Sequence, residues 1–249
     1  MDQDLNDFYI TLHSSASKSI YTENSARSFT NIMRKRIDLQ DPYEVALIEF
    51  TYPNEILNVY NDSSSAHNKI NNRHITQRCF LADGYYGDID KVLKIMNKDL
   101  ENVWTFTLDH KKVVAKGKDK DHSLRLSPTL AKQLGFCNEL VLSAGPIKAD
   151  IEPNMHFGFP SQANIHCNII PHQIYGDRYD KVLRSVTLDH STFTYGGQTC
   201  KNFHWLMYVP VTVKELSEIS IHITSGSFEL FPFSGGTSSV LLHFRKTCQ

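Results

Sequence analysis

The residue types of a metal site occur once at short spacing in this histidine-rich sequence. His166, Cys167 and His172 offer two imidazoles and a thiolate, which are ligands that Zn²⁺ prefers. The first two residues are neighbours, however, and adjacent side chains in an extended strand point to opposite faces of a sheet. They are therefore poorly placed to share one ion, and we expect no metal ligands in this chain.

Three Asp–His pairs have the composition of part of a hydrolase triad, namely Asp109–His110, Asp121–His122 and Asp189–His190. In a Ser–His–Asp triad, a buried Asp from elsewhere in the fold orients the His, and immediate neighbours in an extended chain cannot do this. No GxSxG elbow stands nearby to hold a nucleophile. We expect no catalytic residues.

Phosphate and calcium chemistry also lack their usual patterns. The sequence contains neither a GxxxxGK[ST] loop nor a GxGxxG motif after a strand. Gly235–Gly236 is better explained by a tight turn before a strand. The spacing of Asp83, Asp88 and Asp90 does not match an EF-hand loop. The sequence thus predicts no bound cofactor and no enzymatic activity.

The composition is that of an ordinary folded protein, with 41% hydrophobic and 21% charged residues. A net charge of -1 gives no overall attraction to a polyanion, so a specific nucleic-acid partner is not expected. Two short basic patches occur, at Arg34–Arg36 and among five lysines between positions 111 and 120. We interpret both as solvated loops or strand edges, where Lys blocks unwanted pairing.

The five cysteines are far apart, at positions 79, 137, 167, 200 and 248. An odd number without CxxC spacing is typical of free thiols in a reducing compartment, and not of a disulfide framework or a zinc ribbon. The acidic start, MDQDLNDF, lacks the apolar core of a secretory signal peptide. No segment approaches the roughly 18 apolar residues of a membrane span, so none is expected.

Strand patterns dominate the chain. The predicted strands are 8–13, 27–32, 43–53, 74–81, 103–108, 112–116, 164–170, 182–188, 203–211, 219–224 and 239–245. In the segment 203–211, we expect Phe203, Trp205, Met207 and Val209 to face a buried core. The polar segment 58–72 is predicted to be a long exposed loop.

Two helices are signalled between these strands. Apolar residues at positions 89, 92, 93, 96 and 100 form one helix face, and Asp88 is a suitable N-cap. Ser127 caps a second short helix, with Pro128 in its first turn and Gly135 as its stop. Many strands with helices in a single insertion favour an antiparallel sandwich over βαβ units. We expect one domain over residues 1–249, with a helix-containing insertion at about 83–137.

Several aromatic residues stand close together near predicted turns, and two interpretations remain open for them. They either fill the ends of the sandwich or anchor a partner. The second interpretation is open because aromatic side chains often anchor partners at interfaces. The residues are Tyr85, Tyr86, Phe228, Phe231 and Phe233.

The order of several sequence blocks resembles the minor capsid, or penton, proteins of Polinton (Maverick) elements, adintoviruses and related virophages. The blocks are FYITL, SFTNIMRKRIDLQDPYEVALIEFTYP, GYYGDIDKVLKIMN, SPTLAKQLGF, IHCNIIPHQIYGDRYDKVLRSV and the C-terminal segment from YVPVTVKEL to LLHFRK. They cover nearly the whole chain. The segment SGSFELFPFSG departs from the shorter charged turn that is usual in the family.

This resemblance implies a single jelly roll whose homopentamer forms the five-fold vertices of an icosahedral capsid. The implied partners are further copies of the chain and the major capsid protein. The implied location is the virion, after synthesis in the cytoplasm or nucleus of the host cell. The family's motifs are structural, so the resemblance transfers no catalytic, cofactor or metal residues.

Two other function classes remain as alternatives. One is a β-sandwich binding module that recognises a carbohydrate or a host protein through polar loops such as 14–24 and 58–72. The other is a metal-dependent enzyme of the double-stranded β-helix type, although its usual HxH-containing pattern is missing from the sequence.

Overall fold

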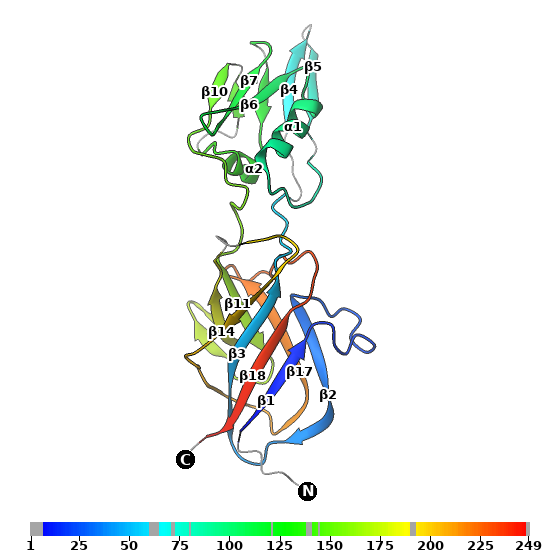
Figure 1. The fold of residues 1–249 in the computed structure, drawn as a ribbon, viewed down its shortest axis with the longest axis vertical. Coiled ribbons are helices and arrows are strands. Elements are labelled where there is room, and N and C mark those ends of the chain that lie inside the picture. The colour runs from blue at the N-terminus through cyan, green and yellow to red at the C-terminus, as the bar shows by residue number, and fades with distance from the viewer. Residues whose placement is uncertain are drawn as a thin grey trace. The chain divides into compact units, whose positions relative to one another are not determined.

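The computed structural model describes residues 7–59, 65–70, 73–79, 81–120, 122–137, 141–143, 145–189 and 193–247. The chain forms two compact units (Figure 1). We call residues 1–56 and 160–249 the sandwich unit, and residues 57–159 the inserted unit.

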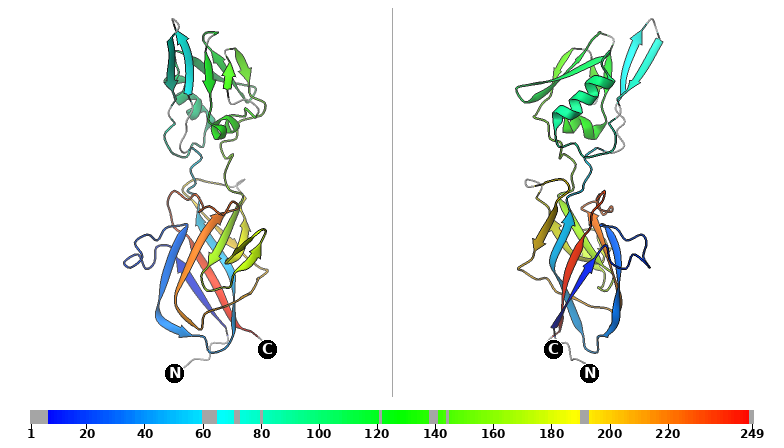
Figure 2. Two further views of the ribbon diagram at one scale, coloured as in Figure 1. Left: turned by 180° about the vertical axis from the view of Figure 1, so that it is seen from behind. Right: turned by 45° about the vertical axis from the view of Figure 1, so that its right-hand side comes forward.

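The sandwich unit is built on two large antiparallel sheets, to which the small β12 (Gln173–Tyr175) and β13 (Arg178–Asp180) hairpin is added. The first sheet has the order β1 (Asp7–His13), β18 (Ser239–Lys246), β3 (Tyr43–Pro53) and β15 (Gln198–Asn202), and β16 (Val209–Pro210) also pairs with β3. The second sheet has the order β14 (Val182–Thr187), β11 (Gln162–Cys167), β17 (Glu215–Ser225) and β2 (Ser28–Asp38). Figure 1 shows β3, β18 and β1 side by side, and Figure 2 shows the second sheet from behind. Most connections cross from one sheet to the other, so the predicted jelly-roll sandwich is confirmed.

Alternation along the strands produces the core between the sheets. Ile219, Ile221 and Ile223 of β17 are completely buried, as the sequence predicts. From the first sheet, Val45 and Phe244 are equally buried. Because side chains in a strand alternate between faces, each strand gives one row of apolar side chains to this layer.

The inserted unit contains two small sheets and two helices. One sheet has the order β10 (Pro146–Lys148), β7 (Lys112–Gly117) and β6 (Trp104–Asp109), and the other β5 (Arg73–Arg78), β4 (Ser65–Ile70), β8 (Ser123–Arg125) and β9 (Val141–Ser143). The helices are α1 (Ile89–Asp99) and α2 (Pro128–Gln133). Trp104, Phe106 and Met96 belong to a hydrophobic cluster of this unit's own residues.

Both predicted helices begin and end as expected. The Asp88 carboxylate accepts from the Asp90 amide at 2.9 Å, and the Ser127 hydroxyl accepts from the Leu130 amide at 3.3 Å. Gly135 has a φ of +90°, and a Cβ built on it would lie 2.3 Å from the Ile151 carbonyl oxygen. Only glycine fits this stop.

Other expectations need correction. The predicted loop at 58–72 contains a strand, β4, which pairs with β5 and β8. Its polar composition concealed it, because a small sheet can hold such a strand through backbone hydrogen bonds. The expected insertion at about 83–137 lies inside the larger inserted unit, Leu57–Phe159. The remaining predicted strands, apart from 203–211, have observed counterparts with slightly different ends.

The predicted strand at 203–211 is wrong except at Val209–Pro210, where Val209 is buried as expected. The predicted burial of Trp205 and Met207 is wrong. Pairing with β3 stops at Asn202 in β15 and resumes only at Val209 in β16. Between these points, Trp205 is 88% exposed and Met207 is 62% exposed. An alternating pattern does not reveal whether a second layer covers its apolar face, and here no part of the described chain does.

The polypeptide enters and leaves the inserted unit through a buried polar contact. The Asn58 side chain accepts from the Tyr86 amide at 2.8 Å and donates to the carbonyls of Tyr86 and Met155, at 2.8 and 2.9 Å. The Gln133 amide donates to the Asn58 carbonyl at 2.7 Å. Asn58 therefore ties the segment that enters the inserted unit to the segment that leaves it.

Replacing Asn58 with Ala should lower the unfolding free energy of the inserted unit by about 3 kcal/mol, because it leaves several buried backbone groups without partners. The chain has two tryptophans, so in a Trp205→Phe background the fluorescence of buried Trp104 reports on this unit during urea unfolding. Asn202→Ala, at an exposed position of β15, is the control and should change stability by less than about 0.5 kcal/mol. Equal midpoints for the two variants would contradict the role of Asn58.

Candidate interaction surface

Of the residues considered as metal ligands, His166 and Cys167 are neighbours on β11, and His172 lies between β11 and β12. His166 contacts the Thr224 hydroxyl at 2.9 Å through Nε2 and the Asp180 carboxylate at 3.3 Å through Nδ1. Cys167 is buried, and burial raises the pKa of its thiol to about 12. His172 stacks on Tyr179 with ring centroids 5.3 Å apart. Across the described ranges, no three His, Cys, Asp or Glu side chains are grouped to hold a metal ion.

Of the three Asp–His pairs, only Asp109–His110 has both of its residues in the described part of the chain. The exposed His110 ring lies 3.5 Å from the Asp109 carboxylate, which also accepts a hydrogen bond from Lys148 at 2.7 Å. That hydrogen bond lowers the pKa of the Asp109 carboxyl. His122 is buried, with Nδ1 2.9 Å from the Val103 carbonyl oxygen. Asp121 and His190 lie outside the described residues, so nothing is concluded about their side chains.

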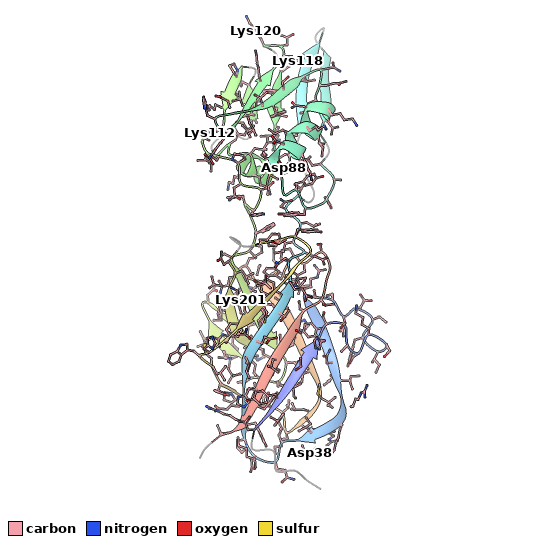
Figure 3. The ribbon with its side chains drawn as sticks, viewed as in Figure 1. Asp38, Asp88, Lys112, Lys118, Lys120 and Lys201 are labelled. Carbon is pink, nitrogen blue, oxygen red and sulfur yellow. The ribbon has the colours of Figure 1, made fainter. Side chains whose placement is uncertain are left out.

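The lysines between positions 111 and 120 lie at the surface of the inserted unit (Figure 3). Lys112 donates to the Asp150 carbonyl and Lys118 to the Glu101 carbonyl. These ammonium groups are thus already engaged by the protein's own backbone, as on a solvated strand edge.

A triad-like contact that the sequence did not signal lies on the outer face of the first sheet. The Asp7 carboxylate contacts His243 Nε2, and His243 Nδ1 lies 2.6 Å from the Tyr208 hydroxyl. Burial raises the pKa of Tyr208, so the hydroxyl stays protonated in its contact with His243. The guanidinium of Arg245 lies 3.5 Å from the centre of the Tyr208 ring. These contacts hold a loop in place.

We call that loop, residues 203–208, the display loop. It starts with a hydrogen bond from the Phe203 amide to the Ile48 carbonyl at 2.8 Å. Arg184 of β14 lies over the Phe203 ring at 4.1 Å and donates to the Trp205 carbonyl at 2.8 Å. With Tyr208 held at the other end, the backbone is anchored along its length. The Trp205 and Met207 side chains nevertheless remain in solvent.

A second exposed apolar surface is the hairpin of β12 (Gln173–Tyr175) and β13 (Arg178–Asp180). Ile174 and Tyr179 are opposite one another in the register, and they are 83% and 70% exposed. The Tyr175 hydroxyl contacts Gln162, Asn164 and Ser185, which are residues of β11 and β14. The hairpin is therefore fastened to the second sheet while its apolar pair points to solvent.

The structure supports the first interpretation for two of the aromatic residues considered in the sequence. Phe231 and Phe233 are buried, 0% and 8% exposed, and plug the sandwich. Phe228 is half-buried beneath Arg178. In the inserted unit, Tyr86 packs against the core and Tyr85 contacts His156. Among the described residues, the three most exposed large apolar side chains are instead on the display loop and the hairpin, namely Trp205, Ile174 and Tyr179.

The comparisons with known proteins identify a fold. No protein-family model and no curated protein sequence matches this chain. A crystal structure of the mavirus penton protein matches with a TM-score of 0.55 and 13% sequence identity, covering 97% of this chain and 99% of that chain. At this identity the likeness concerns the fold. In the described part of the chain, neither helix has the length and hydropathy to cross a bilayer.

The exposure of Trp205 predicts that Trp205→Ala changes the unfolding free energy by less than about 0.5 kcal/mol. The backbone hydrogen bond to Arg184 persists in this variant. In contrast, Phe244→Ala should cost about 3 to 5 kcal/mol, because Phe244 is completely buried. Urea unfolding followed by far-ultraviolet circular dichroism distinguishes the two. A loss of more than about 2 kcal/mol for Trp205→Ala would mean that the side chain packs against the fold.

His166 predicts a pH dependence of stability. Burial lowers the pKa of His166 from its ordinary value of 6.5, more than Asp180 raises it. The unfolded chain therefore binds the proton more readily than the folded chain. As a result, the free energy of unfolding decreases as the pH falls from about 6.5 towards the pKa of His166 in the folded chain. His166→Gln should reduce the loss of thermal stability between pH 7.5 and pH 5, whereas His110→Gln should not. Identical pH profiles for wild type and His166→Gln would contradict this.

Proposed function

We propose that this chain is a minor capsid protein, a penton, which occupies the five-fold vertices of an icosahedral capsid of the Polinton, adintovirus and virophage group. The observation that carries the proposal is the likeness to the mavirus penton protein over 97% of this chain and 99% of that one. A shared sandwich alone would match only part of each chain, so the extent of the match supports a common architecture that includes the inserted unit. The ordered sequence blocks point to the same group.

The proposed role is structural and non-enzymatic. A vertex protein needs a rigid body with well-defined outer surfaces, and the two packed sheets supply one. Five identical copies close into a ring only if one surface of each copy meets a different surface of its neighbour. The outer side chains must also meet the major capsid protein, which is the second partner that we propose. The location is the virion, after synthesis in the cytoplasm or nucleus of the host cell.

The inserted unit belongs to the same capsid domain in this proposal. It leaves the sandwich after β3 and returns before β11, so the jelly roll is continuous on either side of it. Its own hydrophobic cluster gives it stability without residues from the sandwich. Because the strands on either side of it complete one jelly roll, we treat residues 1–249 as one jelly-roll domain with an elaborated connection.

Co-expression with the major capsid protein of the same element tests the proposal. Electron microscopy of the purified particles should show density for this chain at the five-fold vertices and at no other position. Particles formed without this chain serve as the control and should lack that density. Exclusion of the chain from particles would contradict the proposal. Binding of the isolated protein to glycans, abolished by substitutions in the loop 14–24, would then favour a carbohydrate-binding module.

A further inference from the structure

We propose that the display loop is the contact for a second copy of this chain, with Trp205 packing against the flank that the neighbouring copy forms from β2 and the loop 14–24. The proposal rests on the proposed homopentamer and deepens it, because it names the two surfaces that meet. It follows from the strand order and from the exposed apolar side chains at the two ends of the sheets.

The sandwich has two different flanks. The first sheet runs from β1 to β15, and the second runs from β2 to β14. At one flank β1 and β2 are in contact, and at the other Arg184 of β14 reaches the display loop that follows β15. Figure 1 shows the loop after β1 on one side of the sandwich and β14 on the other. These flanks are therefore opposite ends of the same slab.

The flank at β14 and β15 presents apolar side chains from a fixed backbone. Trp205 and Met207 are two residues apart on the display loop, 88% and 62% exposed. The hairpin that carries Ile174 and Tyr179 is tied to the same edge, since Gln173 donates to the Val182 carbonyl of β14 at 3.0 Å. Exposed tryptophan and tyrosine are the residues that most often dominate the binding energy of an interface.

The opposite flank also presents apolar side chains from a fixed backbone. Ile20 is 64% exposed in the loop 14–24, and Ile32 is 37% exposed on β2. Asn24 holds this loop by donating to the carbonyls of Ala16 and Thr30, both at 2.9 Å. The amide of Ile32 donates to the Ser17 hydroxyl at 3.1 Å, which places the loop beside β2.

The presence of both surfaces on one chain favours a second copy as the occupant. A foreign partner would require only one apolar flank, whereas a ring of identical copies requires two that differ. Contact between two display loops would be isologous and would stop at a dimer. Because both surfaces are already ordered by hydrogen bonds, little conformational freedom is lost when they meet. Of the cations near the contact, Arg184 is engaged by the display loop, and Arg36 of β2 by Asp38 and Glu215.

Disulfide trapping in particles tests this contact directly. The full chain, with Cys137, Cys200 and Cys248 changed to Ser, receives Trp205→Cys together with Ile32→Cys, and is co-expressed with the major capsid protein. After mild oxidation of purified particles, a non-reducing gel should show a ladder of cross-linked species up to the pentamer. Each single-cysteine variant should give no ladder.

The failure of the inference is distinguishable from the failure of the proposed function. Absence of the chain from particles would overturn the proposed function. Incorporation of the double variant at vertices without any cross-link, or a dimer from Trp205→Cys alone, would overturn the contact proposed here.

A measurement of the pentamer's dissociation constant tests the same contact without introduced cysteines. Trp205→Ser should raise the dissociation constant of the pentamer at least ~30-fold, as loss of a dominant interface residue does. Val141→Ser is the matched control, because Val141 is 54% exposed but belongs to the inserted unit. The monomeric variant should unfold at the wild-type temperature, since its side chain is in solvent. Equal dissociation constants for the two variants would overturn the proposal.

Discussion

The apolar layer between the two sheets determines what the rest of the sandwich unit can do. Burial of one row of side chains from each strand fixes the register of both sheets, since a slip by one residue would turn every row to solvent. Ile221 and Phe244 are completely buried in this layer. The side chains on the opposite face of each strand do not pack in this core. Function can therefore be placed on the outer faces and flanks without loss of stability.

The β12–β13 hairpin and the display loop lie on these outer surfaces, and polar contacts hold both of them. Asn164 and His166 are on β11 in positions that alternate with core residues, yet they are 0% and 7% exposed because the β12–β13 hairpin lies over them. On the first sheet, His243 is 7% exposed beneath Tyr208 and Tyr9. In both cases a histidine and a tyrosine fasten a segment whose apolar side chains remain in solvent. Buried polar groups that are satisfied in this way favour one arrangement of the segment over others.

The parts of the fold that could be predicted from the sequence are those whose signals are local. Asp88 and Ser127 identify helix starts because an N-cap acts within one turn, and Ile219 to Ile223 identify a strand because alternation acts within a few residues. Trp205 could not be placed, since its exposure depends on where pairing with β3 is interrupted, and β3 is remote in sequence. The contact of Asp7 with His243 joins the two ends of the chain, and no spacing rule reaches that far.

The triad-like group shows why side-chain identity alone does not define an active site. Asp7, His243 and Tyr208 have the order of a nucleophile with its base and orienting acid. Burial raises the pKa of Tyr208, and the Arg245 guanidinium lies over its ring, so these contacts act on Tyr208 as an anchor of the loop. The hydrogen bonds of the group hold the display loop to β18. The same chemistry that would activate a hydroxyl in a polar cleft here stabilises the surface from which Trp205 extends.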